Sequence, residues 1–220
     1  MSASKSSPNA SASTPPTLHQ FFSASEARVD RWRMLGRAAK ALASGTGDGF
    51  LEICVRLLCR HVQITGMYRP HDSAALEWAV KRGRLRYTQA MFTRDELRPA
   101  IRLLKSGGVL WFAPDQETRR GESVFVPFFG QSAWSLTSTH QLARLSGALV
   151  LPLFHERLDN GHYHLEIGAP LENFPSTDAD TDTARVMALM EALIRRVPAQ
   201  YLWIHQRFKR QPEGRASPYQ

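Results

Sequence analysis

Cysteine is scarce in this sequence. The chain has only two, Cys54 and Cys59, and their spacing of five positions on a predicted helix turns them toward different faces. That spacing matches neither a C-x-x-C metal or redox motif nor a recognisable disulfide pattern. The scarcity excludes a secreted scaffold held together by disulfides, and we expect a reduced protein that faces the cytosol.

A long apolar run is also missing. Residues 123–143 carry no Asp, Glu, Lys or Arg over a length that suits a bilayer, but Pro127, Gly130 and many polar side chains argue against a transmembrane helix. The first eight residues are rich in Ser and lack the apolar core of a signal peptide. We therefore expect a disordered Ser/Pro-rich head over residues 1–23 and a single domain over residues 24–220.

Acidic residues are fewer than basic ones. The chain has 20 Asp and Glu against 28 Lys and Arg, which gives a net charge of +8. This excess favours acidic partners such as lipid phosphates, acidic proteins or nucleic acid, and charge alone does not choose among them. We find no zinc-finger spacing, RNA-recognition motif or helix-turn-helix pattern, so nucleic acid is not an expected partner.

A buried strand that ends at a polar site is the clearest positive feature. Residues 109–113 are apolar on both faces, and Pro114 ends the run just before Asp115 and Gln116. Such a run is typical of a parallel strand covered on both sides. Open α/β sheets bind ligands at the carboxyl ends of their strands, so we expect Asp115 and Gln116 to lie at a site.

Helix signals and apolar runs follow one another along the rest of the chain, which predicts an α/β fold. The turn Asp159-Asn160-Gly161 predicts a hairpin between two of the strands. The expected helices cover residues 26–43, 51–60, 74–81, 93–105, 135–145 and 183–197. The expected strands cover residues 62–67, 109–113, 148–154 and 163–167, with a short extended stretch at 84–87.

Aromatic side chains follow the expected site in the run Phe125-Val126-Pro127-Phe128-Phe129. Apolar surface beside a polar site suits an acyl chain, and Phe125 and Phe128 are our candidate contacts for such a chain. Because aromatic side chains are also common in protein interiors, ordinary core packing is the alternative role for this run.

Histidines and an acid gather around the expected hairpin. His155, Glu156, His162 and His164 offer nitrogens and a carboxylate, which are ligands that zinc accepts. Their spacing matches no common metal motif, and histidines on an exposed hairpin are usually incidental. We therefore predict no metal site.

Five sequence blocks follow one another as they do in one known family. Together they resemble the late acyltransferases of lipid A biosynthesis, the lauroyl and myristoyl transferases of the lysophospholipid acyltransferase superfamily. The similarity covers residues 51–219. The blocks are Tyr68-Arg69-Pro70, Gly83-Arg84-Leu85-Arg86, Ala113-Pro114-Asp115-Gln116, Phe125-Val126-Pro127-Phe128-Phe129-Gly130 and Tyr201-Leu202-Trp203-Ile204-His205-Gln206-Arg207-Phe208-Lys209.

The resemblance implies both a fold and an activity. The fold is that of glycerolipid acyltransferases, with a mixed central sheet flanked by helices. Such enzymes move a fatty acyl group from acyl carrier protein to a hydroxyl of an anionic lipid A precursor in Gram-negative bacteria, without a cofactor. Family members usually carry an apolar anchor helix near the amino terminus, and this sequence shows none. The expected location is therefore peripheral, at the membrane surface on the cytoplasmic face of the inner membrane.

The family's chemistry centres on an H-x-x-x-x-D/E motif, in which histidine is the general base and the acid orients it. Glu52 takes the place of the acid, and the resemblance puts Arg84 and Asp115 near it as further catalytic residues. Arg69 follows an expected strand and is a candidate for binding a phosphate, and Gln116 is a candidate hydrogen-bonding partner of the substrate. A structural ion pair is the alternative role for Arg84 and Asp115.

The sequence departs from the family at this motif. Gly47 stands five positions before Glu52, where the family has histidine, and residues 43–50 are too polar and Gly-rich for an apolar strand. We therefore expect that one amino-terminal core strand is missing and that catalysis is impaired. Asp48 is a poor substitute base, because an ordinary carboxylate is weakly basic at neutral pH and Glu52 would repel its charge. The alternative function is a non-catalytic protein that binds acyl chains or lipid.

Overall fold

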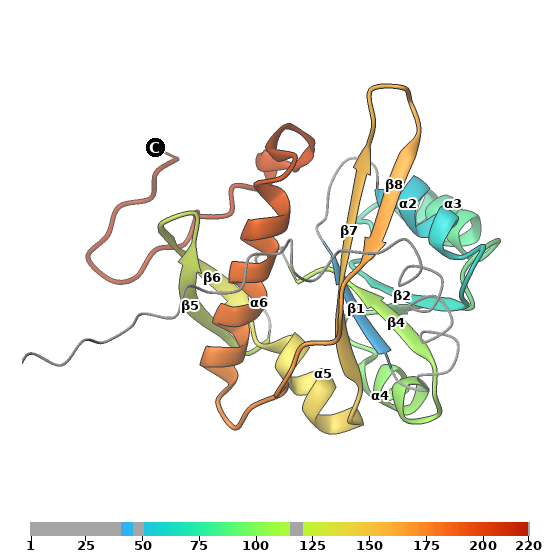
Figure 1. Ribbon diagram of the computed structural model, residues 1–220, viewed down its shortest axis with the longest axis horizontal. Coiled ribbons are helices and arrows are strands. Elements are labelled where there is room, and N and C mark those ends of the chain that lie inside the picture. Colours follow the sequence, from blue (N-terminus) through green and yellow to red (C-terminus); the bar gives the residue numbers. More distant parts are fainter. Residues whose placement is uncertain (1–40, 46–50, 115–120, 220) are drawn as a thin grey trace, which may run out of the picture.

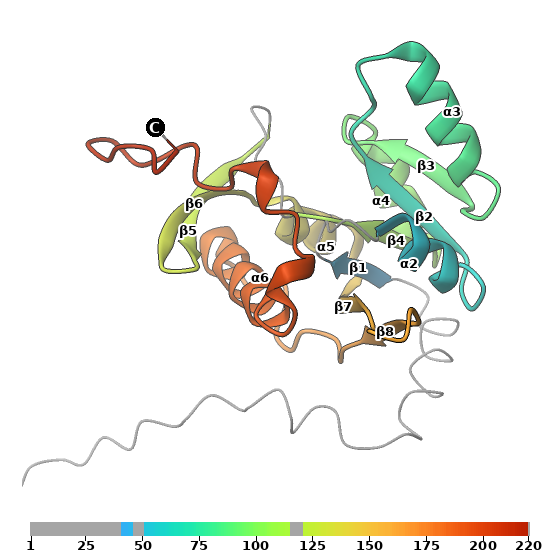
Figure 2. The ribbon, with the colours of Figure 1, turned by 90° about the horizontal axis from the view of Figure 1, so that it is seen from above.

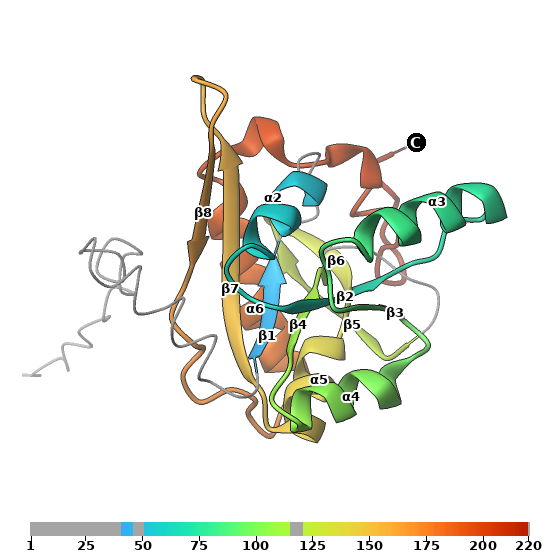
Figure 3. The same cartoon turned by 90° about the vertical axis from the view of Figure 1, so that its right-hand side faces the viewer.

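A computed structural model describes residues 41–45, 51–114 and 121–219 of the chain. Six strands form its main sheet: β1 Ala41–Gly45, β2 Ile64–Tyr68, β3 Ala90–Thr93, β4 Val109–Phe112, β7 Leu149–Arg157 and β8 Tyr163–Ile167. Their order across the sheet is β3-β2-β4-β1-β7-β8, which Figure 3 shows from right to left; β2, β4, β1, β7 and β8 are also labelled in Figure 1. Five strands run parallel, and only β8 pairs antiparallel, with β7. The predicted α/β fold with a mixed central sheet is confirmed.

Strand β4 shows how the sheet is covered on both faces. Val109 and Trp111 point to one face and Leu110 and Phe112 to the other, and all four side chains are at most 7% exposed. Because successive side chains of a strand alternate between faces, a run that is apolar throughout needs cover on both sides. The strand predicted from this run is therefore confirmed.

Helices supply that cover. On the Val109 face, helix α2 (Leu51–Leu58) packs Val55 and Leu58 against the sheet. On the Leu110 face, helices α4 (Leu97–Lys105) and α5 (Ser138–Ser146) complete a second core. Helix α3 (Ala74–Arg84) lies at the margin of the molecule and has no buried residue (Figure 3). The helices therefore flank the sheet as predicted, and α3 is the one that contributes least to the core.

A third core lies beside the main sheet. Strands β5 (Ser123–Phe128) and β6 (Gln131–Leu136) form an antiparallel hairpin that packs on helix α6 (Ala179–Ile194) (Figure 2). Two short 3₁₀ turns, η2 (Pro198–Gln200) and η3 (Trp203–His205), follow α6. None of the helices formed by the described residues is long and apolar enough to cross a membrane.

The prediction that an amino-terminal core strand is missing is wrong. Strand β1 occupies the middle of the sheet, where Ala41–Ser44 pair with β4 and Ala41–Gly45 pair with β7. The predicted helix over residues 26–43 is wrong at its end for the same reason, since Ala41 to Ala43 belong to β1. A strand between two others gains ladder hydrogen bonds on both edges, and these do not depend on large apolar side chains. The predicted head over residues 1–23 and the rest of that helix lie outside the described residues.

Two further expectations about local structure need correction. Helix α3 does not stop at Gly83 but runs through Arg84, so the predicted extended stretch at 84–87 is wrong. Glu96, not Thr93, precedes α4, and its carboxylate accepts a hydrogen bond of 2.7 Å from the Thr93 backbone N–H. Thr93 instead ends β3, a four-residue strand that the apolar pattern did not reveal.

Candidate active site

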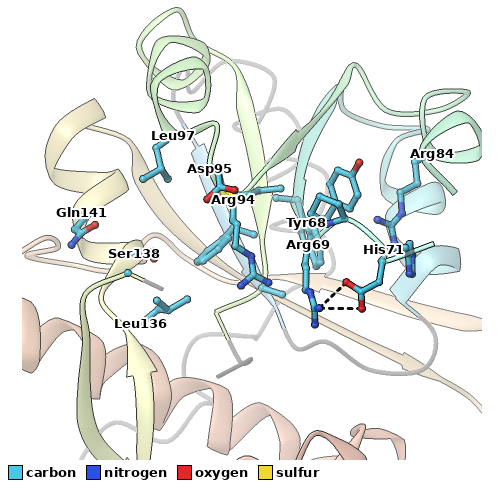
Figure 4. Close-up of a pocket in the computed structure, with 17 residues that line it drawn as sticks. Tyr68, Arg69, His71, Arg84, Arg94, Asp95, Leu97, Leu136, Ser138 and Gln141 are labelled. Carbon is cyan, nitrogen blue, oxygen red and sulfur yellow. Dashed lines mark hydrogen bonds and ion pairs between the residues drawn. The ribbon is translucent and has the colours of Figure 1, made fainter. Parts of the chain in front are cut away.

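A cavity of about 610 Å³ lies at the carboxyl ends of β2, β3 and β4 (Figure 4). The ends of β2 and β4 and the segments that follow the three strands contribute to its lining, as do Arg84 from α3, Leu136 from β6 and Gln141 from α5. Parallel strands bring the connections after their carboxyl ends to one edge of the sheet, which is where open α/β sheets bind ligands. The cavity is therefore in the position where the sequence predicts a site.

Three guanidinium groups line this cavity. Arg69 follows β2, Arg94 follows β3, and Arg84 reaches in from the last turn of α3 (Figure 4). Arg69 pairs with Asp72 at 3.1 Å, but both side chains are largely exposed. Burial, with a smaller contribution from the neighbouring charge of Arg69, lowers the pKa of Arg94. Like charges that face a common space are stabilised by a bound anion, so the cavity suits a phosphate or carboxylate.

Glu52 and Arg84 form the best-defined polar contact beside the cavity. The Arg84 Nε donates a hydrogen bond of 2.9 Å to Glu52 Oε1, and its Nη2 forms an ion pair with the same oxygen. The Tyr87 hydroxyl donates to Glu52 Oε2 at 3.0 Å. These contacts connect α2 with the end of α3 and the turn after it, and they hold both carboxylate oxygens in a fixed direction.

The contacts keep Glu52 ionised. Burial raises the pKa of Glu52, but the hydrogen bond and charge of Arg84 and the hydrogen bond from Tyr87 outweigh that effect and hold the pKa below its ordinary value. For Tyr87, burial and the neighbouring Glu52 carboxylate raise the pKa to about 12, so its hydroxyl remains a donor at neutral pH. A carboxylate with a lowered pKa is a weak proton acceptor and is better suited to orienting another group.

Tyr68 supports the same arrangement from the end of β2. The Arg84 guanidinium carbon lies 5.3 Å from the centre of the Tyr68 ring, within the range of a cation–π contact. The Tyr68 hydroxyl donates to Glu77 on α3, and burial together with this bond raises the pKa of Tyr68 to about 12. Arg84 is therefore held between a carboxylate and an aromatic ring, with 19% of its side chain exposed toward solvent.

Of the residues singled out from the sequence, three come together in the structure. Glu52 contacts Arg84, and Arg84 lines the same cavity as Arg69. Asp115 and Gln116 lie outside the described residues, as does Gly47. Arg94 was missed, because its signal is its position directly after β3 and that strand was itself not predicted.

The two aromatic candidates lie apart from this cavity. Phe128 is fully buried in the core between the β5–β6 hairpin and α6, with its ring centre 4.8 Å from that of Phe129. Phe125 is 39% exposed on β5 and packs on Trp134. Neither residue is among those that line the 610 Å³ cavity. Their contact with an acyl chain stays a prediction, and the observed surroundings of Phe128 are those of a packing residue.

The histidines of the β7–β8 hairpin show no metal-binding geometry. His164 Nδ1 lies 3.0 Å from Glu156 Oε1, and His155 is buried within the sheet. Within residues 41–45, 51–114 and 121–219, no group of three or more His, Cys, Asp or Glu side chains is placed to hold a metal ion.

An α/β sheet with an acid–guanidinium pair beside a cationic cavity is typical of enzymes that bind anionic substrates. This geometry alone does not identify one reaction. The sequence model of the bacterial lipid A biosynthesis acyltransferases matches residues 31–210, and the chain belongs to that family. This confirms the family that the five sequence blocks resemble.

Individual relatives agree with this family. A lipid A biosynthesis palmitoleoyltransferase of Escherichia coli K12 is 42% identical over 164 residues, which are 74% of this chain and 53% of the relative. A lauroyltransferase of the same organism is 40% identical over 156 residues, 70% of this chain and 51% of the relative. A lipid A biosynthesis acyltransferase of Haemophilus influenzae is 30% identical over 201 residues, 86% of this chain and 64% of the relative. The chain thus spans about half the length of the two Escherichia coli relatives.

Proposed function

We propose that this chain has the site of an acyltransferase of lipid A biosynthesis, which moves a fatty acyl group from acyl carrier protein to a hydroxyl of a lipid A precursor. The observation that carries the proposal is the Glu52–Arg84 pair beside a cavity lined by two further arginines. Membership of the lipid A acyltransferase family supplies the reaction class. The names of the relatives support lipid A precursors as the acceptor.

Arg69 and Arg94 are the proposed contacts for the acidic groups of the acceptor. Both line the cavity, and guanidinium groups match the geometry of phosphate oxygens with two parallel hydrogen bonds. Arg84 is already paired with Glu52, so its proposed role is to hold the Glu52 carboxylate in place and to add positive charge to the cavity lining. Asp115 and Gln116, which follow β4, are proposed to complete the site.

In the proposed reaction, a base removes the proton of the acceptor hydroxyl and the oxygen attacks the thioester carbonyl carbon. The carbon–sulfur bond then breaks, and the thiol of the carrier protein leaves with a proton. Glu52 would orient the base and balance its positive charge. The histidine that serves as base in the family's motif is absent at the matching position, where this chain has Gly47. We therefore propose that catalysis by this chain is impaired.

We further propose that the chain works at the cytoplasmic face of the inner membrane as a peripheral protein. The net charge of +8 supports contact with an anionic surface. The second candidate function is a protein that binds lipid or acyl chains without turnover. The cationic cavity beside an ion pair, together with glycine instead of histidine at position 47, favours that candidate over an unrelated activity.

Restoration of the histidine tests the proposal. β1 ends at Gly45 and α2 begins at Leu51, so residue 47 belongs to the connection between a central strand and the helix that carries Glu52. We expect Gly47→His to raise acyl transfer from acyl carrier protein to the lipid A precursor by roughly 10²-fold or more. The matched control is the double variant Gly47→His/Glu52→Gln, which should lose most of that gain.

Three outcomes separate the possibilities. A gain that depends on Glu52 supports the family reaction together with the impairment. Full activity in the unaltered chain contradicts the impairment and requires another base, for which Asp48→Asn is the first variant to measure. No transfer in the folded Gly47→His variant, with precursor binding intact, contradicts the enzyme function and leaves the binding protein.

A further inference from the structure

Helix α3 exposes large apolar side chains to solvent while charged side chains are among its half-buried residues. Trp78 and, seven positions later, Leu85 just after the helix lie on one flank and are 64% and 46% exposed. Leu76, two positions before Trp78 and therefore on the opposite flank, is 49% exposed. The half-buried side includes Glu77, Val80, Lys81 and Arg84, which recur at helical spacing. A surface helix of a globular protein normally has the reverse arrangement.

Polar contacts fix this orientation. Glu77 accepts hydrogen bonds from the Tyr68 hydroxyl and, at 3.0 Å, from the His71 backbone N–H. At the other end, Arg84, the last residue of the helix, is bonded to Glu52 on α2. With both ends of the inner side held by hydrogen bonds, α3 cannot turn Trp78 inward without breaking them. Trp78 therefore faces outward as part of the folded state.

Basic residues surround the apolar side chains. The Arg82 guanidinium carbon lies 5.3 Å from the centre of the Trp78 ring, and Arg86 is exposed just beyond the helix. Arg56 on neighbouring α2 and Arg60 just after that helix are also exposed. The acids of these two helices, Glu52 and Glu77, are both engaged in the hydrogen bonds described above. The surface therefore combines exposed apolar side chains with positive charge.

We propose that α3 lies on the surface of an anionic lipid bilayer, with Trp78 and Leu85 among the acyl chains, Leu76 at the other margin of the contact, and Arg82 and Arg86 at the headgroup phosphates. This pattern is typical of interfacial helices, in which basic and aromatic residues share the boundary between water and hydrocarbon. Tryptophan is enriched at that boundary. Since Trp78 is the most exposed large apolar side chain of the helix, lipid fits this surface better than an acidic carrier protein does.

The location of α3 connects the surface to the cavity. Arg84 belongs to the same helix and lines the cavity, and the segment from Tyr68 to Asp72 leads from the cavity into α3. A bilayer under α3 would therefore lie beside the cavity, where a lipid acceptor needs only a short path to enter. This inference deepens the proposed function by naming its membrane surface, but vesicle binding is measurable without any acyl transfer.

Vesicle flotation with the full chain tests the proposal, using phosphatidylcholine alone or mixed with phosphatidylglycerol. We expect binding only to the mixed vesicles, weakening as salt increases. The variant Leu76→Ser/Trp78→Ser should bind at least about tenfold more weakly because it loses apolar insertion. The variant Arg82→Gln/Arg86→Gln should lose about fivefold per charge. Circular dichroism and thermal melting verify that each variant folds.

Matched controls are exposed apolar residues elsewhere. Ile204→Ser on η3, where the side chain is 80% exposed, and Leu145→Ser on α5, at 55%, should leave binding within about twofold of the unaltered chain. Fluorescence gives a second readout, since the difference between the unaltered chain and Trp78→Phe isolates the Trp78 signal. That signal should shift to the blue on mixed vesicles and be quenched by brominated lipid.

Equal binding by the Leu76/Trp78 variant, or loss of binding in Ile204→Ser instead, would overturn the proposal. A different outcome is that neither the unaltered chain nor any variant binds vesicles, while Arg82→Gln/Arg86→Gln loses affinity for immobilised acyl carrier protein. In that case α3 is a protein-docking surface and the lipid proposal is wrong. Intact vesicle binding in a chain whose Gly47→His variant shows no transfer would contradict the proposed reaction and leave the lipid surface in place.

Discussion

The cavity beside β2, β3 and β4 and the core formed by β5, β6 and α6 use charged residues in opposite ways. At the cavity, Glu52 is 54% exposed and is held by Arg84 and Tyr87. Next to the other core, Asp182 is fully buried, where it lies 2.8 Å from His140 Nδ1 and accepts a hydrogen bond from the Ser176 backbone N–H at 2.7 Å.

The difference separates charged residues that stabilise the fold from charged residues that remain available to a ligand. A buried carboxylate is tolerated only when its hydrogen-bonding partners are all in place, so removing one partner strongly lowers the free energy of unfolding. An exposed ion pair contributes little to folding, because water screens it. We therefore expect substitutions beside α6 to lower the free energy of unfolding and substitutions at the cavity to change binding or transfer with little loss of stability.

The largest expected effect is at Phe128. Its side chain is fully buried between the hairpin and α6, so Phe128→Ala should lower the free energy of unfolding by about 3–5 kcal/mol. Urea unfolding measures the change, with the exposed Leu145→Ala as a control that should stay within about 0.5 kcal/mol. A small loss at Phe128 together with lost acyl-chain binding would instead give this residue the substrate contact predicted from the sequence.

A smaller effect is expected at Asp182. Asp182→Asn keeps the size of the side chain but removes its charge, so the hydrogen bonds from Ser176 and His140 weaken. We expect a loss of about 1.5–3 kcal/mol in the free energy of unfolding. Acyl transfer in the Gly47→His background should change little at a temperature where the variant is folded. A strong loss of transfer without a loss of stability would remove the contrast between the two regions.

At the cavity, Arg94→Gln should leave the free energy of unfolding within about 0.5 kcal/mol of the unaltered chain. Binding of the lipid A precursor should weaken by about 1.5–3 kcal/mol, which is roughly tenfold or more, because a charge-assisted hydrogen bond is lost. Equilibrium binding to the precursor and to its dephosphorylated form measures this. Equal weakening for both ligands would exclude a phosphate contact.

The smallest effect concerns pH and the Glu52–Arg84 pair. The pKa of Glu52 is lower in the folded protein than in the unfolded chain, so the pair stabilises the fold above the unfolded pKa of about 4.3. That stabilisation is lost as the pH falls through the folded pKa. The difference in unfolding free energy between the unaltered chain and Glu52→Gln should be at most about 1 kcal/mol at pH 7 and should shrink below pH about 4.3. A difference that grows on acidification would reverse the sign of the pKa shift.

The sequence was sufficient where the signal was local. The apolar run from Val109 to Phe112 predicts a strand covered on both faces, and all four side chains are buried in this way. The motif match at Glu52 and Arg84 selects two residues 32 positions apart, and they form a direct contact. In both cases the residues themselves determine the outcome, through an uninterrupted apolar run in the first and opposite charge in the second.

The pattern was insufficient where neighbouring strands decide the structure. The residues of β1 were predicted as the end of a helix followed by a polar, Gly-rich stretch, and their place in the sheet comes from ladder pairing with β4 on one edge and β7 on the other. For the segment from Phe125 to Phe129, the sequence left two roles open, contact with an acyl chain and ordinary core packing. Its hairpin pairing with β6 and its packing on α6 bury Phe128 away from the cavity.

The sequence by itself determined the family, the alternation of helices and strands, and the residue types at the site, because these depend on side-chain chemistry and short spacings. The tertiary structure alone decided that β1 completes the sheet, that Arg94 joins Arg69 and Arg84 at one cavity, and that α3 faces outward. Each of these depends on partners distant in the chain, since backbone pairing, shared cavities and the exposure of a helix face arise only when separate segments meet.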